Sequence, residues 1–504
     1  MHIDIKKKKD DENIKVKSIK FNFIMNIILK LSSIIFPLIT LPYVTRVLGT
    51  VGNGKVAFAV SVISYFSMFA QLGIPTYGIR ICAKYRDDKD KLTKTVQEIL
   101  VINTVSAIIT YAVFAGCMLF IPKFQEEPVL LVINSLTIIL NVLAMEWFYQ
   151  SIEQYDYITV RNIFFKLLSL IALFLFIKNK EDYVLYGALS VIAASGSSLL
   201  NAIHARKYLL RKKYKNYNFR QHLKPIINFF LLSVSVSIYT NMDTVMLGFI
   251  SGDNEVGLYN IATKIKTVLA TMVSALGPVL LPRISYYIEK NNMKNVQELI
   301  NKSVHVVIIA SISVTIYFIV MATQTIDVLG GEEYYAAISC MQIIMFTIIP
   351  LGIGNVASMQ ILAPFNKEVK TMYSTVAGAI VNLVVNALLI GRLGAAGAAI
   401  GTVLAETAVT IIQVYYSWNI IGKAIRNVPY KTILVSTIVA TVILIALKSI
   451  LQTSSLVTLI ITALVYYFIY AFILLLGKDK VVLEFMQILT NKITSRFKKN
   501  SDKA

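Results

Sequence analysis

Long apolar runs separated by short polar segments recur along the whole chain. A window of about 19 residues is the natural ruler for such a pattern, because that length of helix crosses the hydrocarbon core of a bilayer. The predicted spans are 22–47, 56–79, 97–121, 129–149, 162–178, 183–203, 226–250, 256–281, 303–323, 336–362, 371–391, 394–418, 431–448 and 454–476. The pattern therefore predicts an all-α membrane protein, a polytopic bundle of about 14 transmembrane helices.

A weak internal repeat divides the predicted spans into two sets of six. Thr45–Gly49 ends one span and is followed by Gly54, and the similar segment Thr244–Gly248 is followed by Gly257 at an offset of about 199 residues. Paired halves are typical of transporters that handle their substrate between two lobes. The expected parts are a cytoplasmic basic tail (1–21), an N-lobe (22–203), a cytoplasmic basic linker (204–224), a C-lobe (225–418), two extra transmembrane helices (419–476) and a cytoplasmic amphipathic basic tail (477–504).

The distribution of basic residues predicts the orientation in the membrane. The chain is 56% hydrophobic and 15% charged, with a formal net charge of +21. If the N-terminal tail is cytoplasmic, the inner segments hold about 38 Lys and Arg residues and the outer loops about six. The positive-inside rule then places both termini in the cytoplasm. We expect this charge to meet anionic membrane lipids rather than nucleic acid, because no basic helix or aromatic platform lies outside the spans.

No motif for catalysis, a cofactor or a metal emerges from the polar residues. The segment 49–55 resembles the start of a phosphate-binding loop, but Val56 stands where the magnesium-binding hydroxyl is needed. Cys82, Cys117 and Cys340 are far apart and form no pair motif. We therefore expect no enzyme activity and no bound cofactor.

Charged residues inside the predicted spans are the candidates for function, because each is costly in hydrocarbon unless it faces protein or water. The substrate-binding candidates are Lys30, Arg46, Arg80, Asp243, Lys264, Lys266 and Arg283, and the ion-coupling candidates are Asp243, Glu406 and Glu146. Arg80, Glu146 and Arg283 lie near inner span ends and could instead reach the headgroups. Basic residues outnumber acidic ones within the spans, which favours an anionic substrate such as a phosphate or pyrophosphate.

Three of these residues allow a structural and a functional interpretation. Asp243 and Lys264 flank one outer loop at similar depth, about 15 Å along their helices, so they could form a structural ion pair or a site that exchanges partners. Glu406 could be a carboxyl kept protonated by burial, or a group that couples transport to protons or sodium.

Trp147 and Trp418 fall at inner span ends, where we expect them to anchor the protein at the membrane interface.

Several segments resemble landmarks of bacterial polysaccharide repeat-unit flippases. The segments are 36–49, which contains Arg46, together with 71–80, 146–155 and the hairpin from Asp243 to Ala262. In these segments the chain is similar to Wzx-type proteins of the multidrug/oligosaccharidyl-lipid/polysaccharide exporter superfamily. The resemblance implies two six-helix lobes with two extra C-terminal helices, in the bacterial cytoplasmic membrane.

The resemblance also implies a substrate and a mechanism. The substrate would be an undecaprenyl-pyrophosphate-linked oligosaccharide, moved from the inner to the outer leaflet by ion-coupled alternating access, with no cofactor beyond Na⁺ or H⁺. Polysaccharide polymerase and glycosyltransferases would be partners. This sequence departs from the family in relying on Lys30, Lys264 and Lys266 rather than on arginine alone. Two alternatives stay open, namely a drug or metabolite cation antiporter of the same superfamily and a non-transport scaffold for polysaccharide assembly.

Overall fold

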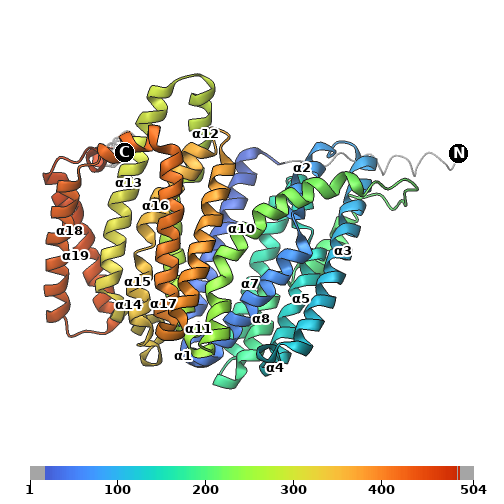
Figure 1. The fold of residues 1–504 in the computed structure, drawn as a ribbon, viewed down its shortest axis with the longest axis horizontal. Coiled ribbons are helices and arrows are strands. Elements are labelled where there is room, and N and C mark those ends of the chain that lie inside the picture. Colours follow the sequence, from blue (N-terminus) through green and yellow to red (C-terminus); the bar gives the residue numbers. More distant parts are fainter. Residues whose placement is uncertain (1–16, 485, 488–504) are drawn as a thin grey trace, which may run out of the picture. The chain divides into compact units, whose positions relative to one another are not determined.

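A computed structural model describes residues 17–484 and 486–487, and within these ranges the regular structure is entirely helical (Figure 1). The described chain forms two compact units, unit 1 (Met1–Gly257) and unit 2 (Leu258–Ala504). The predicted lobes and the linker 204–224 stay predictions. The basic run at 6–9 and most of the predicted amphipathic tail lie outside the described residues.

Unit 1 contains ten α-helices among its described residues. They are α1 (Ile19–Gln71), α2 (Ile74–Lys84), α3 (Lys89–Phe120), α4 (Pro122–Glu126), α5 (Pro128–Ala144), α6 (Glu146–Ser151), α7 (Tyr155–Phe176), α8 (Tyr183–Ser195), α9 (Ser198–Ala205) and α10 (Arg220–Ile250). The long helix α1 packs against α3, α5, α7, α8 and α10, so it is the central element of the unit.

Unit 2 begins within α11 (Asp253–Ser274), and the regular structure of its described part is also helical. Its further helices are α12 (Leu276–Glu289), α13 (Met293–Val320), α14 (Ala322–Gly330), α15 (Ala337–Met345), α16 (Ile348–Asn355), the π-helical segment Val356–Leu362, α17 (Glu368–Arg426), α18 (Tyr430–Ile450) and α19 (Ser455–Leu476). Within this unit α17 packs against α13, α15 and α16, whereas α18 and α19 pack against each other.

The number of transmembrane helices agrees with the prediction. Among the described residues, 11 helical segments are long and apolar enough to cross a membrane. Two of them, containing α1 and α17, are bent at Gly49 and Gly394, where φ is 66° and 53°. Only glycine adopts such left-handed conformations at little cost, so the chain reverses there and each segment supplies two spans. If each of the two bent segments is counted as two spans, the 11 segments supply 13 spans. The helix α10, which has 31 residues, brings the number to the predicted 14.

The two hairpin turns of the predicted repeat touch each other through glycine. A Cβ atom on Gly54 would lie 1.8 Å from the carbonyl oxygen of Asp253, and one on Gly257 would lie 2.0 Å from the carbonyl oxygen of Thr50. These reciprocal contacts bring backbone directly against backbone, which only glycine permits. This close contact between the two turns explains why glycine stands at both positions.

The prediction that Trp147 anchors the membrane interface is wrong. Met145 takes a left-handed conformation with φ 47°, which breaks the helix and turns α6 inward against α2. Trp147 is only 5% exposed, and its ring lies over Gly78, where a Cβ atom would come within 2.6 Å of it. Trp418, by contrast, is exposed. Local backbone geometry, which the sequence pattern does not reveal, decides this difference.

Candidate functional site

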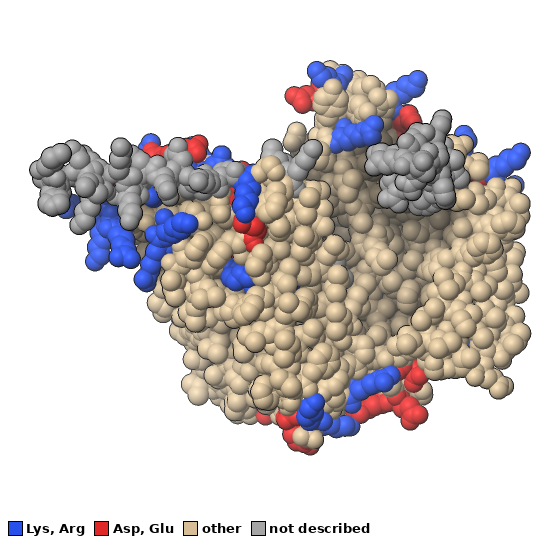
Figure 2. Space-filling view, turned by 180° about the vertical axis from the view of Figure 1, so that it is seen from behind, with Lys and Arg blue, Asp and Glu red and all other residues tan. Residues whose placement is uncertain are grey.

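Charged side chains are rare on the surface between the two ends of the helices. On the face shown in Figure 2, Lys, Arg, Asp and Glu gather along two rims, and the surface between the rims is almost entirely uncharged. A surface of this kind suits contact with lipid hydrocarbon. Charged residues that lie within the helices therefore require a specific explanation.

The basic candidates of unit 1 are exposed. Lys30 and Arg46 lie on α1, and Arg80 lies on α2 with its guanidinium 5.0 Å from the ring centre of Phe229. Lys30 is 11 residues into α1, about 16 Å along the helix axis. Within the described part of unit 1, Lys30 forms no ion pair. No carboxylate in the described part of unit 1 therefore neutralises the ammonium group of Lys30.

Glu146, an ion-coupling candidate, lies in an ion pair. Its carboxylate is 3.4 Å from the guanidinium of Arg161 and accepts a hydrogen bond of 3.3 Å from the amide of Asn162. The Glu146 side chain remains 42% exposed, whereas that of Arg161 is only 6% exposed. The pair therefore joins the start of α6 to α7 and leaves the carboxylate accessible from one side.

Sequence reasoning missed Arg161, because it began the fifth span at residue 162. The helix begins at Tyr155, so Arg161 lies inside it, with its guanidinium 5.4 Å from the ring centre of Tyr157. Lys166 in the same helix was also missed and donates hydrogen bonds to the hydroxyls of Ser32 and Ser33, at 3.0 and 2.9 Å. The lysine within an apolar run was the available signal for this contact between α7 and α1.

Asp243 is buried in α10, at 5% exposure, and acts electrostatically on the hydroxyl of Tyr65 in α1. Its predicted partner, Lys264, belongs to unit 2. The pairing of Asp243 with Lys264 therefore stays a prediction. Burial of a carboxylate inside a transmembrane helix supports its choice as a candidate site residue.

Charges at the predicted outer end of unit 1 form a compensated cluster. Lys55 lies 2.6 Å from Glu127, and Lys123 lies 3.1 Å from Asp253 and 2.6 Å from Glu126. Burial opposes the charged form of Lys123, but the two carboxylates outweigh it and raise the pKa of this lysine. The acidic outer segments therefore hold helix ends together and leave little net charge for a ligand.

The basic candidates of unit 2 lie on two consecutive helices. Lys264 and Lys266 on α11 are half-buried and form no ion pair within the described part of this unit. Arg283 on α12 is exposed and donates a hydrogen bond of 3.4 Å to the hydroxyl of Tyr287. Both lysines thus resemble Lys30 in lacking a carboxylate partner within their own unit.

Glu406 is one of several buried oxygen-bearing side chains on α17 in unit 2. It is 5% exposed and one helical turn beyond Thr402, whose hydroxyl is 2.8 Å from that of Tyr259. In the other half of α17, Asn386 donates a hydrogen bond of 3.1 Å to Asn382, and both amides are buried. Carboxylate, amide and hydroxyl oxygens are the ligands that small hard cations prefer, so these buried side chains of α17 are candidates for binding a cation or a proton.

Comparison with known proteins assigns the chain to a family. The family model described as "Polysaccharide biosynthesis protein" matches residues 19–288, more than half of the chain. The chain belongs to this polysaccharide biosynthesis protein family. A second family model, MatE, matches residues 229–388.

Curated relatives of this family member include two named transport proteins. The "Putative O-antigen transporter" of Escherichia coli (strain K12) is 24% identical over 404 residues, which cover 80% of this chain and 97% of that protein. A "Probable low-salt glycan biosynthesis flippase" of Haloferax volcanii is 23% identical over 240 residues, covering 47% of this chain and 51% of the relative.

Solved structures support the fold of this family member. The lipid II flippase MurJ in an inward closed conformation aligns with a TM-score of 0.69 at 14% identity, covering 91% of this chain and 99% of MurJ. An inward-facing multidrug transporter of the MATE family aligns with a TM-score of 0.56 at 13% identity, covering 78% and 96%. These alignments and the apolar helices establish a multi-pass membrane protein with a polytopic helical bundle.

Proposed function

We propose that this protein is a flippase that moves undecaprenyl-pyrophosphate-linked oligosaccharides from the inner to the outer leaflet of the bacterial cytoplasmic membrane. The glycan would serve capsule, O-antigen or another surface polysaccharide. Glycosyltransferases and polysaccharide polymerase would be its partners in assembling the glycan. Family membership and the names of the relatives support this proposal.

The observation that carries the proposal is the excess of positive charge within the helices. Lys30, Lys264 and Lys266 have no carboxylate partner within their own units, although each lies within a predicted transmembrane span. A lysine at the centre of a membrane helix costs about 3 kcal/mol when it faces lipid. An aqueous path that receives a pyrophosphate would remove this cost, since the ammonium groups would bind the phosphate oxygens.

We further propose that transport is coupled to a cation or proton through the buried side chains of α17 that include Glu406, with Asp243 and Glu146 as further candidates. A buried carboxylate exchanges a proton or a small cation only when its surroundings change. Alternating access of the two predicted lobes would supply that change, with both termini in the cytoplasm. None of these residues is assigned a catalytic role, and the proposed protein is not an enzyme.

The proposal is tested by flipping in proteoliposomes. The probe is a radiolabelled undecaprenyl-pyrophosphoryl oligosaccharide, and the readout is the rate at which its glycan becomes accessible to periodate outside the vesicle. Lys30→Gln and Lys264→Gln should each slow flipping about tenfold or more, because each removes a charge-assisted hydrogen bond. Lys290→Gln is the matched control, since Lys290 lies at the end of α12 outside the apolar part of the helix.

Imposed sodium and proton gradients test the coupling in the same vesicles. We expect one of the two gradients to accelerate wild-type flipping and Glu406→Gln to abolish that acceleration. Lysine variants that flip at the wild-type rate would contradict the role of the basic residues. Gradient-independent flipping by the wild type would contradict the coupling while leaving the substrate assignment intact.

One rival function has a specific observation in its favour. The MatE model matches residues 229–388, and the MATE transporter structure aligns with most of the chain. A cation antiporter should accumulate or expel an organic cation such as ethidium. The unpaired lysines argue against this substrate class, because positive charge within the helices repels an organic cation.

A further inference from the structure

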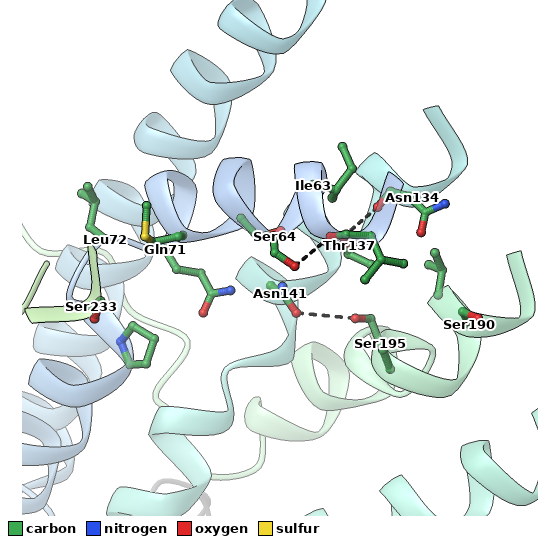
Figure 3. A pocket seen from close by; sticks show the side chains of 16 residues that line it. Ile63, Ser64, Gln71, Leu72, Asn134, Thr137, Asn141, Ser190, Ser195 and Ser233 are labelled. Atoms are coloured by element: carbon green, nitrogen blue, oxygen red, sulfur yellow. Dashed lines mark hydrogen bonds between the residues drawn. The ribbon is translucent and has the colours of Figure 1, made fainter. Parts of the chain in front are cut away.

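A cavity inside unit 1 is lined by polar but uncharged side chains. Its volume is about 480 Å³, and it lies between the second half of α1, the start of α2, α5, α8 and α10 (Figure 3). The polar lining residues are Ser64, Ser67, Gln71, Asn134, Thr137, Asn141, Ser190, Ser195 and Ser233. At about 30 Å³ for each water, such a space holds roughly sixteen waters, so it is large enough for a sugar.

Several polar groups at this cavity have no partner in the protein. Within the described residues, the side chains of Ser67, Gln71 and Ser190 form no hydrogen bond. Asn141 receives only a long contact of 3.5 Å from Ser195, and Figure 3 shows the side chains of Gln71 and Asn141 directed into the space between the helices. These side chains face the cavity with free donors and acceptors, so they can hydrogen-bond to water or to another polar occupant.

The chemistry of the lining selects the class of occupant. The 16 lining residues include no Lys, Arg, Asp, Glu or aromatic side chain. A pyrophosphate would lack positive partners here, and an organic cation would lack both a carboxylate and an aromatic face. Serine hydroxyls and side-chain amides can each donate and accept, which matches the hydroxyl groups of a neutral sugar. Val60, Ile63 and Leu72 provide apolar surface for the CH face of the ring.

We propose that this cavity is a binding site for neutral sugar residues of the lipid-linked glycan, separate from the basic residues that bind the pyrophosphate. The inference rests on the proposed flippase function. The cavity extends from the middle of α1's second half to Gln71 and Pro75, at the helix ends predicted to be cytoplasmic. That is the side on which the proposed substrate would be loaded.

The test measures binding of two probe lipids to the purified full-length protein by thermophoresis. One probe is an undecaprenyl-pyrophosphoryl neutral trisaccharide, and the other is undecaprenyl pyrophosphate without sugar. The wild type should bind the glycan-bearing lipid at least tenfold more tightly. Gln71→Leu and Ser190→Ala should each reduce that preference about two- to tenfold, the effect of losing one hydrogen bond, without changing binding of the sugar-free lipid.

Thr104→Val is the matched control, because Thr104 bonds only to its own helix and is exposed on α3, outside the cavity. It should leave both affinities unchanged. Equal wild-type affinity for both probes, or cavity variants with wild-type preference, would overturn the inference and show a cavity that holds only water. An equal loss of both affinities in the cavity variants would also overturn it, since that pattern indicates a structural role. Failure of the wild type to bind either lipid would instead reject the proposed function.

Discussion

Replacing Gly54 by alanine tests the contact between the two hairpin turns. In an ordinary helix this substitution is stabilising, because alanine exceeds glycine in helix propensity by about 1 kcal/mol. Here the added Cβ atom would lie 1.8 Å from the carbonyl oxygen of Asp253 and 2.9 Å from the backbone nitrogen of Gly257. A Cβ contact below 3.0 Å is essentially never seen, so the two turns must move apart by at least 1.2 Å.

The expected loss of stability in Gly54→Ala follows from which atoms must move. Both clashing groups are backbone atoms of the second turn, which cannot rotate away as a side chain can. Overpacking of this kind costs about 1–3 kcal/mol, and a backbone clash belongs at the upper end of that range. After the gain in helix propensity is subtracted, we expect Gly54→Ala to destabilise the protein by about 2 kcal/mol. Gly257→Ala should behave alike, because its Cβ atom would meet the Thr50 carbonyl oxygen at 2.0 Å.

The assay is thermal unfolding in detergent, followed by circular dichroism. Gly116→Ala on α3 is the control, because no atom lies within 4 Å of the Cβ atom that it adds. This control should raise the unfolding temperature, whereas Gly54→Ala should lower it. If Gly54→Ala unfolded at or above the wild-type temperature while the control behaved as expected, the turns could not be in contact.

Three further predictions concern single side chains. Asp88 caps α3, and its hydrogen bonds to Lys91 lower its pKa below 3.8, so its stabilising effect is present above that pH and is lost as the pH falls through the lowered value. Amide exchange in the first turn of α3 should show this loss, and Asp88→Asn, which also caps, should remove the pH dependence. Trp147→Ala should cost about 3–5 kcal/mol in thermal unfolding and Trp147→Phe much less, because the indole nitrogen has no hydrogen-bond partner among the described residues. Glu146→Gln should cost about 2 kcal/mol by leaving Arg161 buried without its carboxylate, and adding Arg161→Met should recover most of that loss in denaturant unfolding.

The helices could be predicted from the sequence because a span depends mainly on a run of apolar residues. The bend at Gly49 falls between two predicted spans, and the bend at Gly394 falls at the first residue of one, so fourteen apolar runs could be counted although α1 and α17 each continue through a bend. The start of α7 was placed too late, because Tyr155, Asp156 and Tyr157 have the polarity of a loop. That error removed Arg161 from the list of charges inside helices.

The partners of the site residues could not be predicted, because they depend on packing between distant segments. Glu146 was selected as an ion-coupling candidate from its place near a span end, but its contacts to Arg161 and Asn162 depend on how α6 and α7 meet. The sugar-sized cavity gave no sequence signal at all. A serine such as Ser190 within an apolar helix usually bonds to its own backbone, so only the fold distinguishes one that faces a cavity.

The central claim is that the protein moves an anionic lipid-linked glycan rather than an organic cation. Its most direct test compares both substrates in one preparation of wild-type proteoliposomes, with empty vesicles as the background. The account predicts that the labelled undecaprenyl-pyrophosphoryl oligosaccharide changes leaflet well above background, while ethidium does not cross. Ethidium transport without movement of the glycan-bearing lipid would contradict the account.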